Sequence, residues 1–287
     1  MTILGELKSL ASLKFLKKRK KLRESIYSLA ELRDLILAHQ TLHIQQSHPN
    51  PLNKFGKKTF SQTDEDGITV EILRRIGILD KGTFAEFGVG DGTENNTLIL
   101  KALGWKGFWV GGESLAYEIK PQQNFSYINA WITLSNIIEL TIRGKSQIDS
   151  NTIDVISLDL DGNDIYFVEK LLSNRFHPKL FIVEYNAKFI PPIKWQIDYD
   201  ENHFWKKDDY LGASLQSFIE VFNTYGYRLV CCNAHSGSNA FFVQEEYESA
   251  FHDIPSDANL LFVAPRYYAY KNYGHPSSIK TISKLFE

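Results

Sequence analysis

Residues 86–96 combine acidic side chains with closely spaced glycines. The run reads Glu86-Phe87-Gly88-Val89-Gly90-Asp91-Gly92-Thr93-Glu94-Asn95-Asn96. Glycines at 88, 90 and 92 let the main chain turn sharply and approach a ligand without an intervening Cβ atom. The carboxylates of Glu86 and Asp91 would repel a pyrophosphate but suit a sulfonium or ammonium group. We therefore predict a site for S-adenosylmethionine (SAM), formed by Glu86, Gly88, Gly90, Asp91, Gly92 and Asn96.

A dinucleotide site is the main alternative for a glycine-rich run of this kind. Its fingerprint, G-x-G-x-x-G, requires a third glycine at position 93, which is Thr93 here. Glu86, placed just before the turn, would also oppose a pyrophosphate. Both features argue against an NAD-dependent oxidoreductase.

Glu113 follows a second apolar run, Gly107–Gly112. A carboxylate has two acceptor oxygens and can therefore bind both hydroxyls of a ribose. We predict that Glu113, together with Ser114, contacts the cofactor. The alternative is a surface glutamate that opens a helix, where the helix dipole favours a negative charge.

Acidic and amide side chains follow two further apolar runs. Asp159 and Asp161 are two residues apart, so in an extended strand both point to one side. Glu184-Tyr185-Asn186 follows the next run. Carboxylate and amide oxygens suit Mg²⁺ or Mn²⁺. The predicted metal ligands are Asp159, Glu184 and Asn186, with Asp161 as the alternative to Asp159.

A structural role is the alternative for the polar residues of this segment. Asp161, Asn163 and Asp164 directly precede a helical pattern that begins near residue 164. Side chains of these types cap helix N-termini. In that case they would stabilise the helix, and no metal would be required.

Methyl transfer to a neutral hydroxyl requires removal of its proton as well as positioning of donor and acceptor. A histidine suits this role because its pKa lies near neutrality. His235, at the end of a predicted strand, is the preferred base, and Asp161 is an option if no metal is present. His203, in a polar loop, is a further candidate.

The elements that must position these residues are short apolar runs separated by helical patterns. The runs are Thr83–Gly90, Gly107–Glu113, Ser126–Ile132, Ile153–Asp159, Leu180–Tyr185 and Tyr227–Asn233; the helical patterns include Asn95–Leu103, Asp164–Phe176 and Leu215–Tyr225. Runs that are apolar on both faces indicate a parallel sheet covered by helices. Asn239–Gln244 follows closely enough to form a hairpin. We predict an α/β, Rossmann-like, doubly wound and mostly parallel seven-stranded sheet, with one antiparallel strand at or near its edge.

Residues 187–213 form a connection that is long for a compact domain, which is typical of a lid or binding loop. It is rich in aromatic residues: Phe189, Trp195, Tyr199, Phe204, Trp205 and Tyr210. Two interpretations stay open. The loop contacts a small-molecule or glycan acceptor, or it covers an interface in a homo-oligomer.

The N-terminal region differs from the rest of the chain. Residues 1–23 contain eight basic residues and one acidic residue, whereas the whole chain of 287 residues has a net charge of −2. We predict a helical extension and linker over residues 1–58 and a catalytic domain over residues 59–287. Residues 1–23 are either a solvated terminal helix or an amphipathic helix on the inner face of an anionic membrane.

Composition narrows the protein class further. Because residues 1–23 are strongly basic and the whole chain has a net charge of −2, the rest of the chain is acidic. This argues against a nucleic-acid partner, because nucleic-acid binding normally requires a basic face. The two cysteines, Cys231 and Cys232, are adjacent and unsuited to a disulfide framework, so a reducing, cytoplasmic compartment is expected.

Several motifs together resemble the FkbM-like methyltransferases. They are Phe60–Gly67, Glu86–Gly92, D-x-D-G-N-D at Asp159–Asp164, E-Y-N at Glu184–Asn186 and N-A-x-x-G-x-N-A-F-F-V at Asn233–Val243. The resemblance covers roughly residues 60–245. It departs from the usual pattern at Asp161-Gly162, where Glu-Gly is typical.

The resemblance implies the class I fold and a SAM-dependent O-methyltransferase that acts on sugars or secondary metabolites. The polar residues after the fourth and fifth runs also look similar to the Mg²⁺ site of catechol-type O-methyltransferases. A non-catalytic scaffold with the same fold is the alternative, and it predicts little or no SAM binding.

Overall fold

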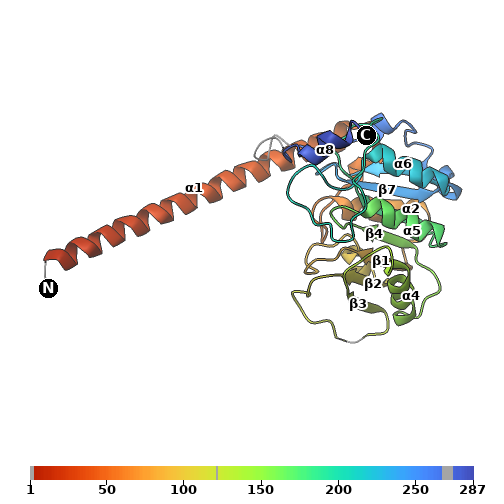
Figure 1. Cartoon of the computed structure of the whole chain (residues 1–287), viewed down its shortest axis with the longest axis horizontal. Helices are drawn as coiled ribbons and strands as arrows, with labels where there is room; N and C mark the ends of the chain where they lie inside the picture. Colours follow the sequence, from red (N-terminus) through yellow and green to blue (C-terminus); the bar gives the residue numbers. More distant parts are fainter. Residues whose placement is uncertain (1–2, 121, 267–273) are drawn as a thin grey trace. The chain divides into compact units, whose positions relative to one another are not determined.

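The computed structural model describes residues 3–120, 122–266 and 274–287 (Figure 1), and the side chains of residues 3–16 lie outside this description. The chain divides into two compact units between His43 and Ile44. Helix α1 (Ile3–Ser47) forms the first unit and continues into the second. Along α1, residues 17–23 are exposed, and the rest of the basic segment falls outside the described side chains. None of the described helices is both long and apolar enough to span a membrane.

The second unit is built on a mostly parallel sheet. Its strands are β1 (Thr83–Phe87), β2 (Lys106–Gly111), β3 (Phe125–Asn129), β4 (Val155–Leu158), β5 (Leu180–Glu184), β6 (Tyr227–Cys232) and β7 (Asn239–Gln244). The seven strands lie in the order β3-β2-β1-β4-β5-β7-β6. Strand β7 lies between β5 and the edge strand β6 and pairs antiparallel with both. The structure therefore confirms the predicted Rossmann-like, doubly wound fold with one antiparallel strand near the edge.

Helices cover both faces of the sheet. They are α2 (Glu65–Arg75), α3 (Leu98–Ala102), α4 (Ile137–Gln147), α5 (Asp164–Ser173), α6 (Leu215–Thr224), α7 (Ala258–Leu261) and α8 (Ile279–Lys284), with 3-10 helices η1 (Pro51–Phe55) and η2 (Glu245–Phe251). Helices α4, α5 and α6 pack side by side along the sheet (Figure 1). Helix α2 contacts η1, and both η1 and α7 contact β6. Burial from both sides explains why the strands are apolar throughout.

Helix α4 is the main element that the sequence analysis does not identify. It contains Gly144 and several β-branched residues, which lower helix propensity. Tertiary packing explains the glycine, because a Cβ atom at Gly144 would lie 2.2 Å from Cδ2 of Phe108 in β2. The helix can approach the sheet this closely only without a side chain at that position.

Residues 44–58, predicted to be part of the extension and linker, belong to the larger compact unit. Asn50 and Asn53 are fully buried, and their amide groups donate to the carbonyl oxygens of Val230 and Cys232, each at 2.8 Å. Leu52 between them is also fully buried. These contacts attach residues 50–53 to β6. Both cysteines are buried free thiols.

Candidate functional site

The carboxyl ends of β1, β4 and β5 meet at one edge of the sheet. The strands run parallel, with Phe87 beside Leu158 and Leu158 beside Val183. The residues that follow each strand therefore emerge close together. In such sheets, ligands bind outside these carboxyl ends.

The glycine loop, residues 88–92, packs tightly between its neighbours. Gly88 has a φ of +93°, and a Cβ atom there would lie 1.6 Å from the Asp159 carbonyl oxygen. A Cβ atom at Gly111, at the end of β2, would lie 1.9 Å from the carbonyl oxygen of Val89. By contrast, nothing lies within 4 Å of the corresponding position at Gly90. The loop is thus closed by main-chain packing on both sides and open at Gly90.

Glu86 supports this loop from within the protein. It is only 5% exposed, and its carboxylate accepts hydrogen bonds from the main-chain amides of Asn96 (2.9 Å) and Thr97 (3.0 Å). The Thr97 hydroxyl donates to it as well. Burial raises the pKa of Glu86, and these hydrogen bonds oppose that rise. The contacts hold the start of α3 against β1.

The other predicted cofactor residues of this segment lie around the loop. Asp91 is exposed, and it accepts hydrogen bonds from the amide and hydroxyl of Thr93, which lower its pKa. Gly92 has a φ of +83°, and its carbonyl accepts from the Tyr117 hydroxyl at 3.0 Å. Asn96 is buried, and its amide donates to the Ser157 hydroxyl.

The segment after β2 folds back over the glycine loop. The Ala116 amide donates to the Asp91 carbonyl at 2.8 Å. The Glu113 carbonyl accepts from the Asn129 amide group at 2.9 Å, while its side chain is exposed. Ser114 is exposed too and lines a cavity of about 600 Å³ beside β3. Glu113 therefore has a fixed main chain and a carboxylate open to solvent at the predicted ribose position.

Trp131, which the sequence analysis does not single out, lies beside this segment. Its ring is 58% exposed, and a Cβ atom at Gly112 would lie 3.2 Å from it. Its indole nitrogen donates to the Glu201 carbonyl at 2.9 Å. The sequence gives no signal of this exposure, because Trp131 lies within the predicted run Ser126–Ile132.

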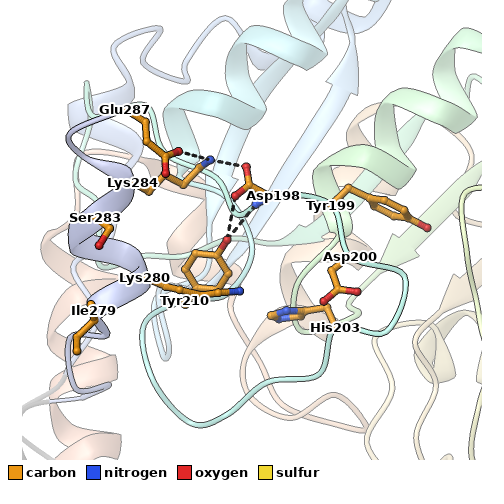
Figure 2. A pocket seen from close by; sticks show the side chains of 10 residues that line it. All are labelled: Asp198, Tyr199, Asp200, His203, Tyr210, Ile279, Lys280, Ser283, Lys284 and Glu287. Carbon is orange, nitrogen blue, oxygen red and sulfur yellow. Dashed lines mark hydrogen bonds and ion pairs between the residues drawn. The ribbon is translucent and has the colours of Figure 1, made fainter.

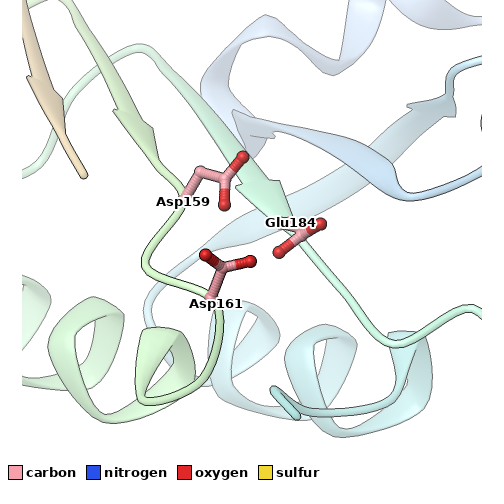
Figure 3. Close-up of side chains that lie close together, drawn as sticks. All are labelled: Asp159, Asp161 and Glu184. Atoms are coloured by element: carbon pink, nitrogen blue, oxygen red, sulfur yellow. The ribbon is translucent and has the colours of Figure 1, made fainter. Parts of the chain in front are cut away.

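Three carboxylates converge at the ends of β4 and β5 (Figure 3). One oxygen each of Asp159, Asp161 and Glu184 lies within 4.8 Å of the others. Burial, and to a lesser extent the charge of Asp161, raises the pKa of Asp159 to about 6. Burial and the charges of the neighbouring aspartates also raise the pKa of Glu184 well above its usual value. Within the described residues, no lysine or arginine forms an ion pair with them. Binding of a proton or a cation would therefore relieve the repulsion within the cluster.

Asn186, a predicted metal ligand, has other partners. Its amide nitrogen donates to the carbonyls of Asp209 and Leu211, each at 3.0 Å, and its oxygen accepts from the Lys188 amide at 3.2 Å. The side chain is 3% exposed. Asn186 thus ties the two ends of loop 187–213 together, and Asp161 completes the carboxylate group that the structure brings together.

The capping alternative applies to part of the same turn. The Asp164 carboxylate accepts from the amides of Leu160 (2.8 Å) and Gly162 (2.9 Å). Burial, followed by the charge of Asp159, raises the pKa of Asp164 to about 7. Asp161 has a φ of 54°, in the left-handed region. Asp164 therefore shapes the turn that presents Asp159 and Asp161.

The two candidate histidines lie in different places. His235 is in the turn between β6 and β7, and its main-chain amide donates to Asp64 at 3.0 Å. His203 packs on the turn after β4, because a Cβ atom at Gly162 would lie 2.2 Å from its Cδ2 atom. Burial lowers the pKa of His203. The structure brings His203 next to Asp161, although the sequence analysis prefers His235.

The β6–β7 turn is held by the acidic segment that precedes α2. Asn233 donates to the carboxylates of Asp64 and Glu65, each at 3.0 Å, and Asn239 also donates to Glu65 at 3.0 Å. Glu65 is 1% exposed, and burial raises its pKa. Two of the motifs quoted for the family resemblance, Phe60–Gly67 and Asn233–Val243, are thus parts of one structural network.

Loop 187–213 has a small core of its own. Phe189 and Trp195 stack with ring centroids 4.4 Å apart, and Tyr210 packs edge-on against Trp195. Phe204, in contrast, is 66% exposed. Three of the six loop aromatics therefore stabilise the loop itself, whereas Tyr199 packs against Tyr166 and Phe167 of α5.

Comparisons with known proteins found no matching family model and no matching curated protein. Solved structures that match part of this chain include fibrillarin in a fibrillarin/Nop5p complex, with 13% identity and a TM-score of 0.33, covering 57% of this chain and 72% of the other. Another is CalO1, a methyltransferase in calicheamicin biosynthesis in its SAH-bound form, with 16% identity and a TM-score of 0.34. That match covers 62% of this chain and 54% of CalO1. At these identities and TM-scores, neither structure establishes an activity for this chain.

Proposed function

We propose that this protein is a SAM-dependent methyltransferase that transfers the methyl group to a hydroxyl of a sugar, glycan or secondary metabolite. The observation that carries the proposal is the packing of the glycine loop on the end of β4. Gly88 rests on the Asp159 carbonyl, so the loop that is open at Gly90 adjoins the carboxylates. The proposed cofactor site and the proposed reaction site thus adjoin at one edge of the sheet.

The residues around the loop fit the chemistry of SAM. Gly90 leaves space beside the main chain, and Asp91 offers a negative charge near it. Glu113 and Ser114 would bind the ribose, and the exposed ring of Trp131 would stack on the adenine. SAM supplies an electrophilic methyl group on a sulfonium, and the role of this chain is to hold the acceptor hydroxyl in line with it.

The carboxylate cluster fits a divalent cation by its donor set. We propose that Asp159, Asp161 and Glu184 hold Mg²⁺ or Mn²⁺, because oxygen ligands suit these ions and no lysine or arginine within the described residues forms an ion pair with these carboxylates. Such an ion lowers the pKa of a bound hydroxyl. Without it, Asp161 and His235 remain candidates to accept the proton, together with His203.

Cofactor binding by the full chain tests the proposal first. Isothermal titration calorimetry should detect SAM and S-adenosylhomocysteine but not NAD. NAD binding without SAM binding would identify an oxidoreductase. If neither SAM nor NAD binds, a non-catalytic scaffold that shares the fold is favoured.

Turnover tests the second half of the proposal. Release of S-adenosylhomocysteine should be measured with sugar, glycan and phenolic acceptors, in Mn²⁺ and in EDTA. Mass spectrometry of the product should show one added methyl group on oxygen. Full turnover in EDTA would remove the metal from the proposal and leave the methyl transfer in place.

A further inference from the structure

A cavity separates loop 187–213 from the C-terminal helix α8 (Figure 2). It measures about 300 Å³, and a neighbouring cavity of about 560 Å³ shares five of its lining residues. The shared residues are Asp200, His203, Tyr210, Ile279 and Lys280. Both volumes lie within the range of roughly 300–1,000 Å³ that is common for small-molecule sites.

Specific contacts hold α8 in this position. The carboxylate of Asp209, which is fully buried, accepts from the Ser278 amide at 2.7 Å and from the Thr281 hydroxyl at 2.8 Å. Lys284 forms an ion pair with Asp198 at 2.5 Å. The walls on both sides of the cavity are therefore anchored to each other.

The cavity is tied to the turn that carries Asp161. Asn163, which follows this turn, donates to the Asp200 carbonyl at 2.7 Å and accepts from the Asp200 amide at 3.2 Å. His203 lines both cavities and packs on Gly162. One wall of the cavity is thus in direct contact with the segment that presents the carboxylate cluster.

The chemistry of the lining indicates a neutral, polar ligand. Carboxylates and ammonium groups are mixed, with Asp200 and Asp208 facing the same cavity as Lys206 and Lys280. Lys280 lies over the ring of Tyr210, 4.6 Å from its centroid. A phosphate or a cation would meet repulsion from half of these groups, and a lipid would leave them unpaired. Hydroxyl groups can donate to the carboxylates and accept from the ammonium groups.

We propose that this cavity binds a neutral carbohydrate and that α8 is one wall of its site. The exposed ring of Phe204, which also lines the larger cavity, offers an aromatic face for a sugar ring. The sugar's role as methyl acceptor rests on the proposed function, whereas its binding does not. Residues of α8, which lie outside the family resemblance, would then contribute to selection of the acceptor.

The test uses the full chain and a pair of neighbouring variants on α8. Ser283 lines the cavity, whereas Ile282 does not and is 48% exposed. Ser283→Trp should fill the cavity, and Ile282→Trp adds the same ring outside it. Binding of neutral mono- and disaccharides is measured by saturation-transfer NMR and calorimetry, and SAM is titrated in parallel.

We expect at least one sugar to bind, with its affinity reduced at least about tenfold in Ser283→Trp and unchanged in Ile282→Trp. Lys280→Ala provides a second test if Ser283→Trp does not fold. Absence of sugar binding, or equal sugar affinity in the cavity variants, overturns the inference even if SAM binds. Sugar binding that is lost in Ser283→Trp supports it even if SAM does not bind, and in that case only the proposed function fails.

Discussion

The main chain of Gly88 lies so close to Asp159 that a Cβ atom at residue 88 would be 1.6 Å from the Asp159 carbonyl oxygen. The contact joins the first residue after β1 to the first residue after β4. No side-chain movement can relieve such an overlap, because the opposing atom belongs to the main chain. The contact therefore couples the glycine loop to the carboxylate turn.

Gly88→Ala should consequently destabilise the protein by at least about 3 kcal/mol, since it combines a main-chain overlap with a positive φ. Gly90→Ala should leave stability within about 0.5 kcal/mol, because Gly90 faces open space. It should instead weaken SAM binding at least about tenfold. Urea unfolding and SAM titration measure the two effects. Normal SAM affinity in Gly90→Ala would place the cofactor elsewhere.

Glu86 and Glu113 should respond differently to neutralisation. Glu113→Gln should lower SAM affinity about tenfold with little change in stability, because its carboxylate is exposed. Glu86→Ala should lower stability by roughly 1–3 kcal/mol, because two buried main-chain amides lose their acceptor. Thermal unfolding and calorimetry separate these outcomes. A stable Glu86→Ala protein that no longer binds SAM would show that Glu86 contacts the cofactor directly.

Removal of one carboxylate should abolish the proposed metal site. Asp161→Asn and Glu184→Gln should each weaken Mn²⁺ binding at least about tenfold. Asp149→Asn is the matched control, because Asp149 is an exposed aspartate with a φ of 49° that asparagine tolerates. Asn186→Ala should retain Mn²⁺ binding but increase amide exchange in loop 187–213. Loss of Mn²⁺ binding in Asn186→Ala alone would restore the ligand set predicted from sequence.

Stability should depend on pH through the same cluster. The pKa values of Asp159 and Asp164 are raised, to about 6 and about 7, so the folded state binds protons more tightly than the unfolded state. The stabilisation that these two protonated carboxyl groups contribute to the folded state is complete below about pH 4, and it is lost as pH rises through 6–7. In EDTA, the free energy of unfolding should therefore fall more steeply between pH 5 and pH 8 in the wild type than in Asp159→Asn.

Addition of Mn²⁺ at pH 8 should raise the stability of the wild type, because the ion replaces the protons that the cluster has lost. Asp159→Asn should show a smaller increase. A wild-type curve that matches the variant at every pH would mean that these carboxylates do not repel one another in the folded protein.

Much of the architecture could be predicted from the sequence because its signals are local. All seven strands and the antiparallel β7 correspond to predicted runs, and the run Asn239–Gln244 agrees with β7 at both ends. A parallel sheet requires strands that are apolar on both faces, so each strand is visible in a window of a few residues. The rule that ligands lie at the carboxyl ends then directs attention to Gly88–Gly92 and to Asp159.

The partners of individual side chains could not be predicted in this way. Asn186 and Glu184 are two residues apart, yet one ties together a loop and the other joins the carboxylate cluster. Sequence spacing does not show which main-chain groups a buried amide must satisfy. The partners of Glu86 could not be predicted either. Its carboxylate oxygens accept hydrogen bonds from the amides of Asn96 and Thr97, ten and eleven positions along the chain.

The sequence by itself determined the strands, the helices α3, α5 and α6 between them, and the acidic and glycine residues at the strand ends, because hydrophobic periodicity follows from local burial. Only the tertiary structure decided that His203, from a long loop, lies on Gly162 and that α8 closes a cavity beside it. Those contacts join segments far apart in the chain. Their geometry depends on how a loop returns across the sheet, which no local pattern encodes.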